Sequence, residues 1–328
     1  MIRIRRRPLR KPEATGIPSA WGRASVGSRF SGVTIVIEIR RLSDCTWKEA
    51  VGVWNEGFQD YFADVKMDAD AFTARLVREG LSPELSVMAF HDGRPAGILL
   101  SGIRLIGGKR VAWNGGTAVV PRTRRLGVGQ ALVEAALGIY RENRADIATL
   151  EAIRQNKRAI ALYKRMGYQT VDRLGVYRCA GPLPDVFFRG GDGESYTVRR
   201  GRPQEAARLP FYRLTAPWQT HWQSLVGGES LIAFDSGGNA AGYALCRRAY
   251  DPAGNLTGIT LFQCEAAPGR GDREAVTGFL LGEAFAPLHL PVRRTAFNLP
   301  LSNRAVSGLL ERAGFSLELE QVHMIRHC

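Results

Sequence analysis

The sequence contains no hydrophobic run that approaches the roughly 18–20 residues needed by a membrane-spanning helix. Its five cysteines include no CxxC pair, and its five histidines form neither an HExxH nor an HxH motif. These absences argue against a membrane protein, a disulfide framework and a metal site, and they favour reduced thiols in a cytoplasmic protein. Apolar residues make up 45% and charged residues 23% of the 328-residue chain, which is typical of folded domains and long enough for about two.

The chain carries a formal net charge of +14, and acidic residues are scarcest at its N-terminus. Residues 1–32 hold eight basic side chains against Glu13 alone, so they contribute 8 − 1 = +7. With three prolines and no helical or strand period, this segment is predicted to be a disordered basic tail. Three interpretations stay open: a solvated extension without function, an arm that binds nucleic acid or another acidic surface, and a targeting peptide.

Hydrophobic periodicity after this tail predicts alternating strands and helices. Strands are expected at 34–40, 85–91, 94–106, 110–120, 147–153 and 168–177. Helices are expected after Asp44 or Thr46, at 68–78, from 128 onward, and at 156–166 before Gly167. Residues 181–194 are rich in proline and glycine and are predicted to be a linker.

The C-terminal part of the chain repeats the N-terminal part in the same order. The segment 231–245 resembles 87–100, because both contain a turn followed by an Ala-Gly pair. At one offset of 147 residues, the following residues recur: Pro121 as Pro268, Asn156 as Asn303, Leu162 as Leu309 and Gly167 as Gly314. We interpret this pattern as a tandem duplication.

The most informative stretch, residues 119–130, joins a predicted strand to a predicted helix. Gly127 and Gly129 allow the backbone to approach a ligand closely. The free N–H groups of the turn and of the first helical turn then point into one volume, where the helix dipole adds positive potential. Three arginines surround this volume, and no acidic residue follows until Glu134. The pattern predicts a phosphate site; an ordinary tight turn before an amphipathic helix is the alternative.

Two motifs resemble those of the GCN5-related N-acetyltransferase (GNAT) superfamily. Residues 124–129, Arg-Arg-Leu-Gly-Val-Gly, are similar to the R/Q-x-x-G-x-G/A pyrophosphate motif, and Val119 and Pro121 match the strand that leads into it. The second signature consists of Leu150-Glu151-Ala152-Ile153 followed by Asn156, Ala159, Leu162-Tyr163 and Gly167-Tyr168. The resemblance covers 34–180 well and 195–328 weakly, and Arg125 stands where many members have glycine.

The resemblance implies an acyltransferase with acetyl-CoA as co-substrate. The pyrophosphate would lie on the N–H groups of Arg124, Arg125, Leu126, Gly127, Val128, Gly129 and Gln130. The pantetheine arm would pair with the strand that ends at Val119 and Val120, where a backbone N–H near 118–120 would hold the developing oxyanion. Asn156 would either bond the pantetheine or only cap its helix.

The resemblance also implies roles in proton transfer. Tyr163 lies where the family keeps the general acid that protonates the leaving thiolate, although a core aromatic on an amphipathic helix would have the same spacing. Glu151 is the best candidate for the general base, with Glu56 and Asp60 as alternatives, and a solvated charge is the ordinary reading of a lone carboxylate. No cysteine lies within the motifs, so direct transfer in a ternary complex is expected, without a metal ion.

The second copy has lost these parts. At the offset of 147, Gly271, Glu274 and Val276 replace Arg124, Gly127 and Gly129, while Leu310 replaces Tyr163 and Asn298 replaces Glu151. Acidic residues at the helix start would repel a pyrophosphate, and leucine gives no proton. We therefore expect a folded but catalytically silent copy that braces the first one and lines the acceptor cleft. Within it, Trp218, His221 and Trp222 either line an acceptor pocket or pack as ordinary core and surface residues.

Together these observations predict an α+β (α/β) fold of two tandem GNAT-like domains, each a mixed, mostly antiparallel central sheet flanked by helices. The expected division is a basic tail at 1–32, a catalytic domain at 33–180, a linker at 181–194 and a degenerate domain at 195–328. The expected activity is acetyl transfer from acetyl-CoA to a primary amine of a small molecule or peptide, which the sequence does not specify. A non-catalytic CoA-binding regulator and a basic nucleic-acid or partner-binding protein are the alternatives.

Overall fold

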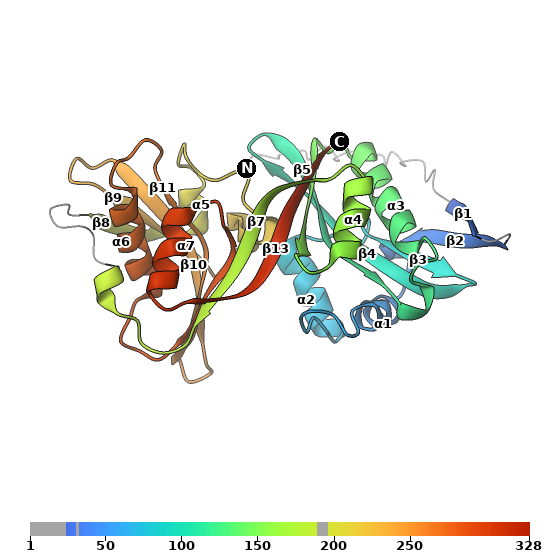
Figure 1. The fold of residues 1–328 in the computed structure, drawn as a ribbon, viewed down its shortest axis with the longest axis horizontal. Helices are drawn as coiled ribbons and strands as arrows, with labels where there is room; N and C mark the ends of the chain where they lie inside the picture. Colours follow the sequence, from blue (N-terminus) through green and yellow to red (C-terminus); the bar gives the residue numbers. More distant parts are fainter. Residues whose placement is uncertain (1–23, 31–32, 189–195) are drawn as a thin grey trace, which may run out of the picture.

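The computed structural model describes residues 24–30, 33–188 and 196–328, and shows two lobes joined by long central strands (Figure 1). Most of the predicted basic tail, residues 1–23 and 31–32, lies outside the described residues. The prediction of disorder is wrong for β1 (Ala24–Phe30), which pairs antiparallel with β2 (Val33–Arg41). Main-chain pairing with β2 forms this strand, so it needs no apolar alternation of its own. No helix in the described ranges is both long and apolar enough to cross a membrane.

The first lobe, residues 33–168, is a sheet with two helices on each face. Its strands are β2, β3 (Val87–His91), β4 (Arg94–Ile106), β5 (Lys109–Val119) and β6 (Ile147–Ile153). One face packs on α1 (Trp47–Gly57) and α2 (Ala69–Glu79), and the other on α3 (Val128–Glu142) and α4 (Lys157–Arg165). Of the two expected start signals, Thr46 caps α1 with a reciprocal bond to Glu49, and Asp68 caps α2.

The second lobe, residues 196–315, repeats this order with fewer helices. It contains β8 (Thr197–Gly201), α5 (Pro203–Ala206), β9 (Glu229–Phe234), β10 (Ala240–Tyr250), β11 (Leu256–Ala266), α6 (Arg273–Phe285), β12 (Arg293–Pro300) and α7 (Arg304–Arg312). Two short 3₁₀ turns, Trp218–Thr220 and Trp222–Ser224, precede β9. Helices α4 and α7 start 147 residues apart, and so do β7 (Gln169–Cys179) and β13 (Ser316–His327). The duplicated fold is confirmed.

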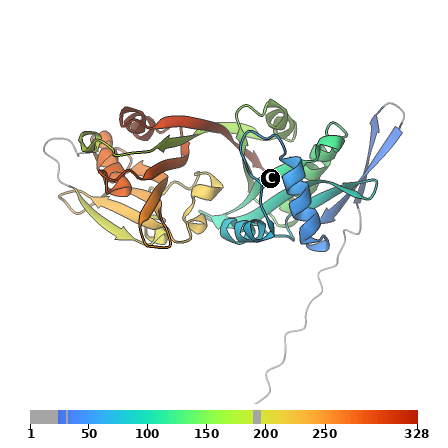
Figure 2. The ribbon, with the colours of Figure 1, turned by 90° about the horizontal axis from the view of Figure 1, so that it is seen from below.

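The two lobes exchange their last strands, which the sequence analysis did not predict. The sheet order is β1-β2-β3-β4-β5-β6-β13-β7-β12-β11-β10-β9-β8, so thirteen strands of the described chain form one sheet. Strand β13 completes the first lobe by pairing with β6, while β7 completes the second by pairing with β12. The two exchanged strands also pair with each other, and they run side by side through the centre of both views (Figures 1 and 2). The boundary predicted at residue 180 therefore divides the chain but not the sheet.

A buried arginine anchors the segment that follows β7. Arg294 on β12 is fully buried, and its guanidinium donates to the carbonyls of Gly181, Pro287 and Phe285 at 2.7, 2.6 and 3.1 Å. Further bonds go to the carbonyls of Leu290 and Val292. The Phe285 carbonyl lies at the C-terminal end of α6 and the others belong to irregular segments, so Arg294 satisfies acceptors that no helix or strand pairs.

We expect Arg294→Met to lower the free energy of unfolding by about 3 kcal/mol or more, because several buried carbonyls lose their donor at once. Guanidinium unfolding measures this change. The neighbouring Arg293 is exposed, so Arg293→Met is the matched control and should stay within about 0.5 kcal/mol of the parent protein. Equal unfolding free energies for the two variants would show that the guanidinium is dispensable.

Candidate active site

A cavity of about 880 Å³ lies in the first lobe, where the end of β5 meets α1, α3 and α4. Its wall includes residues 57–62, 124–125, 127–130 and 155–159, together with Thr117, Val119, Leu162, Tyr163 and Arg165. Gly57, the last residue of α1, allows this helix to approach β5, since a Cβ there would lie 2.7 Å from the Cβ of Ala118. Most of the predicted site residues are thus brought together, whereas Val120, Leu126 and Glu151 do not line this cavity.

The turn before α3 has the backbone geometry that an anion site needs. Arg125 has φ 71° and Gly127 has φ 87°, so both residues adopt the left-handed conformation. Arg125 therefore takes the conformation that glycine takes easily, at a cost of about 1–2 kcal/mol for a residue with a side chain. Gly127 is the N-cap of α3 and brings no side chain to its N–H groups. The turn leaves this helix end open.

Several main-chain N–H groups in this turn have no acceptor within the described part of the chain. They are those of Arg125, Gly127, Val128, Gly129 and Gln130. The N–H groups of Arg124 and Leu126 differ, because they donate to Pro121 and Thr123 at 3.2 and 3.3 Å. The unpaired N–H groups cluster at the positive end of the α3 dipole and make the turn suitable for a phosphate group.

The charges around the cavity are almost all positive. Its lining includes Arg124, Arg125, Lys157, Arg158 and Arg165, with Asp60 as the acidic residue. Two of the arginines noted in the sequence are already engaged. Arg122 is paired with Glu56, and the Arg124 guanidinium donates to the carbonyls of Val119 and Gly57 at 3.2 and 3.1 Å. The N–H groups, rather than these two side chains, are therefore the free donors of the turn.

Strands β5 and β6 separate beside the cavity. Their parallel pairing runs from Val111–Ile147 to Asn114–Leu150 and ends there. A bulge at Gly115 interrupts the pairing of β5 with β4, because Leu100 faces Gly116 while Ser101 faces Asn114. Beyond the bulge, the edge of β5 has no β6 partner. We call this gap between β5 and β6 the split.

The direction of the last β5 amides follows from strand alternation. The Val120 N–H donates to the carbonyl of Ala96 on β4, so it is not free to hold an oxyanion. Successive residues of a strand turn their N–H groups to opposite edges. The N–H and carbonyl of Val119 therefore face the split, and this carbonyl meets the Arg124 guanidinium. Within 118–120, Val119 is the residue whose N–H can meet a developing oxyanion.

Tyr163 on α4 lines the cavity and is 7% exposed. Burial raises the pKa of its phenol, while hydrogen bonding to Thr117 and Asn114 at the β5 bulge acts in the opposite direction. The phenol is therefore protonated at neutral pH and lies beside the split, as a proton donor requires. Its ring also makes an edge contact with Tyr168, at 6.0 Å between centroids, so the packing role weighed in the sequence analysis is present as well.

Asn156 is the N-cap of α4, where its side chain accepts a bond of 3.2 Å from the Ala159 N–H. It also lines the cavity, together with Tyr61. Burial raises the pKa of the Tyr61 phenol, and a hydrogen bond to Asn156 opposes this shift. The sequence analysis missed Tyr61 and the rest of the wall at 57–62. The aromatic run Phe58-Gln-Asp-Tyr-Phe62 after a helix was the available signal.

Glu151 lies on β6, next to the split but outside the cavity. Its carboxylate accepts from the indole of Trp113 at 2.7 Å and from the main-chain N–H of Trp218 at 3.4 Å. His323 of β13 faces it, with Nε2 4.0 Å from Oε1. Burial raises the Glu151 pKa to about 7, and the two hydrogen bonds oppose this rise. Such a pKa suits a group that exchanges a proton at neutral pH.

The two alternative carboxylates lie elsewhere. Glu56 is committed to its ion pair with Arg122, while Asp60 lines the cavity with φ 58°. Within the described ranges, no group of three or more His, Cys, Asp or Glu residues is arranged to hold a metal ion. Neither alternative is buried beside the split as Glu151 is.

The second lobe has the same elements, but the pocket at the equivalent position is much smaller. At the offset of 147, Thr117, Asn156 and Ala159 become Cys264, Asn303 and Val306, and the pocket that these three line has a volume of about 10 Å³. The Asn303 side chain donates to the Cys264 carbonyl at 3.1 Å and so ties α7 to β11. The gap between β11 and β12 is therefore closed where that between β5 and β6 is open.

The start of α6 also differs in charge from the start of α3. Asp272 is the N-cap of α6 and is held by Arg270 at 2.8 Å and by the Tyr196 hydroxyl at 2.7 Å. Glu274 in the first turn pairs with Arg312 of α7. These carboxylates already supply negative charge at the helix end, which opposes phosphate binding there.

The three candidates for an acceptor pocket, Trp218, His221 and Trp222, lie in different surroundings. Trp218 crosses from the second lobe and stacks on Trp113, at 5.3 Å between ring centroids and 10° between planes. His221 is buried, and burial lowers its pKa to about 4. Trp222 packs in the second lobe, against the cluster that contains Tyr212 and Tyr243. Trp218 and His221 line a cavity where the two lobes meet.

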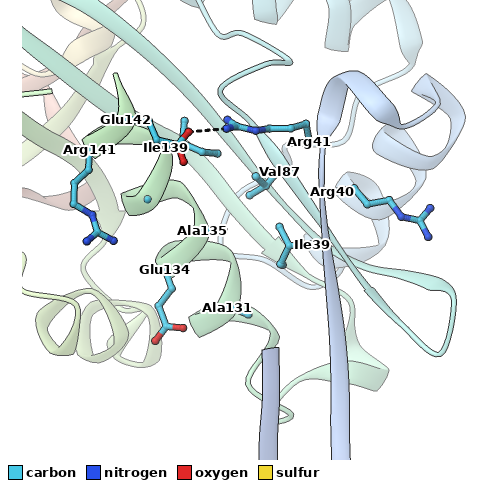
Figure 3. Close-up of a pocket in the computed structure, with 11 residues that line it drawn as sticks. Ile39, Arg40, Arg41, Val87, Ala131, Glu134, Ala135, Ile139, Arg141 and Glu142 are labelled. Carbon is cyan, nitrogen blue, oxygen red and sulfur yellow. Dashed lines mark hydrogen bonds and ion pairs between the residues drawn. The ribbon is translucent and has the colours of Figure 1, made fainter. Parts of the chain in front are cut away.

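A mainly apolar pocket of about 480 Å³ lies between β2 and α3 (Figure 3). Ile39, Val87 and Ile139 line it, and an ion pair of 2.9 Å joins Arg41 to Glu142 at one end. None of the predicted site residues lines this pocket. Neither Tyr163 nor Glu151, the two candidates for proton transfer, is in its wall. It is therefore not the candidate site.

Comparison with known proteins finds acetyltransferases among the matches. The model of the family described as "Acetyltransferase (GNAT) family" matches residues 39–168. The N-alpha-acetyltransferase MAK3 of Arabidopsis thaliana is 34% identical over 100 residues, which are 30% of this chain and 51% of that protein. The match thus spans about half the length of this curated relative.

Solved structures resemble nearly the whole chain in fold. A GCN5-related N-acetyltransferase from Sphaerobacter thermophilus has a TM-score of 0.60 and 17% identity, covering 89% of this chain and 95% of that one. A tandem GNAT protein from the clavulanic acid biosynthesis pathway has a TM-score of 0.55 and 14% identity, covering 89% and 98%. At these identities the likeness concerns the fold alone.

Proposed function

We propose that the chain is an acyltransferase of the GNAT superfamily and that it transfers an acetyl group from acetyl-CoA to a primary amine in its first lobe. One observation carries this proposal: a cluster of unpaired N–H groups at the start of α3 opens onto a basic cavity of about 880 Å³. The cavity is at the upper end of the range for small-molecule and cofactor sites. The second lobe, with its acidic helix start and closed gap, would then be structural.

In the proposed complex, the residues of the first lobe bind and orient the co-substrate. The N–H groups of residues 125 and 127–130 hold the pyrophosphate of acetyl-CoA. The basic side chains that line the cavity attract the remaining phosphate of this molecule. The pantetheine lies along the free edge of β5 and displaces the Arg124 guanidinium from the carbonyl of Val119. The thioester then reaches the split, where the Val119 N–H polarises its carbonyl.

The transfer itself needs two proton movements. The neutral amine nitrogen attacks the thioester carbon, the C–N bond forms and the C–S bond breaks. The amine passes its proton to the Glu151 carboxylate, and the departing thiolate takes a proton from the Tyr163 phenol. Because both groups lie beside the split, direct transfer needs no acetylated enzyme intermediate. A regulator that binds CoA without turnover would release no thiol when amines are supplied.

We expect Gly129→Asp to raise the Kd for CoA at least about 100-fold, as measured by isothermal titration calorimetry. A carboxylate in the first turn of α3 stabilises the helix through its dipole but repels the pyrophosphate, so folding and binding separate. A Cβ at Gly129 meets Leu162 at 3.4 Å, an ordinary contact. Gly138→Asp on the same helix is the control, with open space around its Cβ, and should keep the parent Kd within about twofold. Equal Kd values for both variants would place the phosphates elsewhere.

We expect Tyr163→Phe to lower kcat about 100-fold or more while the Kd for acetyl-CoA stays unchanged, because the phenol donates a proton only in the transition state. Thiol release with an accepted amine gives kcat, and calorimetry gives Kd. Tyr168→Phe removes a hydroxyl from the neighbouring buried ring and is the matched control. If Tyr163→Phe kept the parent kcat, Tyr163 would have a packing role and no role as a proton donor.

With Glu151 as base, kcat at saturating amine should fall about tenfold per pH unit below pH 7, because the Glu151 pKa is raised to about 7 and the base must be ionised. The pH profile of thiol release measures this limb. Glu151→Gln should lower the rate and remove the limb, whereas Glu318→Gln, an exposed substitution on β13, should preserve it. A limb that survives in Glu151→Gln belongs to another group.

A further inference from the structure

A second cavity, of about 290 Å³, lies where the two lobes meet. It is lined by exchanged strands β7 and β13, by β5 and β6, and by the segment 213–221 of the second lobe. Its polar lining comprises Thr149, Asp172, Arg213, Thr215, His221 and His323, while the remainder is largely apolar. It shares no lining residue with the cavity proposed for acetyl-CoA. We call it the interlobe cavity.

Two polar groups in its lining are buried without a hydrogen-bond partner in the described structure. They are Nε2 of His323, a residue that is 4% exposed, and Nε of Arg213. The rest of the Arg213 guanidinium is neutralised by Glu265 at 3.0 Å and Asp172 at 3.5 Å. An unpartnered buried polar group costs roughly 1–3 kcal/mol, so these atoms favour a ligand that supplies their missing partners.

The interlobe cavity is next to Glu151, which contacts two residues of its wall. The His323 ring in its wall stands 4.0 Å from the Glu151 carboxylate, and the Trp218 N–H, also in its wall, donates to that carboxylate. Thr149 precedes Glu151 by two residues on the same face of β6. The split begins beside Asn114 and Leu150, so a group that reaches Glu151 from this cavity also stands beside the split.

The interface beside this cavity is closed by contacts of the 218–219 segment. The indole of Trp218 donates to the Glu79 carbonyl at 2.8 Å, and Gln219 donates to the Glu79 carboxylate at 2.8 Å. The Arg104 guanidinium covers the other part of this indole, 4.1 Å from a ring centroid. These contacts fix the 218–219 segment over α2 and β5 and so narrow the space between the lobes.

We propose that the interlobe cavity is the acceptor site and that it takes a small primary amine carrying an oxygen acceptor, instead of the N-terminus of an extended peptide. The amine lies against Glu151 and His323. A hydroxyl or carbonyl oxygen of the same molecule accepts from Arg213 Nε, and its apolar body contacts side chains such as Leu174 and Ile325. A volume near 290 Å³ lies at the small end of ligand pockets and suits such a molecule. This inference rests on the proposed acetyl transfer.

A panel of amines tests the substrate class. Phenylalaninol and tyrosine amide carry the oxygen acceptor, 2-phenylethylamine lacks it, and pentapeptides with free N-termini represent the extended class. Thiol release from acetyl-CoA should give kcat/KM values at least tenfold higher for the first two than for 2-phenylethylamine, and at least 100-fold higher than for the peptides. Peptides acetylated as efficiently as the small amines would overturn the proposal, and so would no turnover of any small amine by a protein that binds acetyl-CoA. Failure to bind acetyl-CoA in calorimetry would instead defeat the proposed function.

A filled cavity tests the location. Val171 lines the interlobe cavity and is 51% exposed, so Val171→Trp adds bulk there without entering the core. We expect it to raise KM for phenylalaninol at least tenfold while the Kd for acetyl-CoA stays unchanged. Val77→Trp on α2 is the control, because Val77 is 80% exposed and lines neither cavity. An unchanged KM in Val171→Trp would place the acceptor elsewhere.

Discussion

The exchange of β7 and β13 is the constraint on which the rest of this structure depends. Because β13 pairs with β6, His323 stands opposite Glu151, and because the lobes are joined in one sheet, Trp218 is held against Trp113. These residues exclude water from Glu151, and this loss of solvation raises its pKa to about 7. An isolated first lobe would lack β13 and the Trp218 segment, so Glu151 would keep neither its His323 neighbour nor its cover. The second lobe therefore acts on the site of the first through direct contact.

The two copies illustrate how one backbone plan leads to opposite electrostatics. Both have a strand, a turn and a helix whose N-terminus points toward a gap between two strands. In the first copy, Gly127 begins α3 and leaves its N–H groups free, whereas in the second Asp272 begins α6 and is held by Arg270 and Tyr196. Likewise, Asn156 caps α4 beside an open split, while Asn303 bridges to Cys264 across a closed gap. A few side chains decide whether the same elements enclose about 880 or about 10 Å³.

Local patterns accounted for most elements and for the turn at 124–130. Caps such as Thr46 and Asp68, and left-handed glycines such as Gly167 and Gly314, act through neighbours in sequence, so they are legible without a fold. The partner of a strand depends on distant segments, and both the β1 pairing and the exchange of last strands escaped prediction for that reason. The wall around Tyr61 was missed because an aromatic run after a helix is equally typical of core packing. Glu151 was named from its strand, but the groups that bury it lie 67 and 172 residues further along the chain.

The sequence by itself indicated the resemblance to the GNAT family, the duplication and an anion-binding turn before α3, because motifs, a constant offset of 147 residues and glycine positions are properties of neighbouring residues. Tertiary structure alone decided that two domains share one sheet, that Glu151 is buried between lobes, and that a second cavity lies beside the Trp218 and His323 residues that contact it. The reason is physical: desolvation and strand pairing depend on which distant surfaces meet, and no local pattern encodes that meeting.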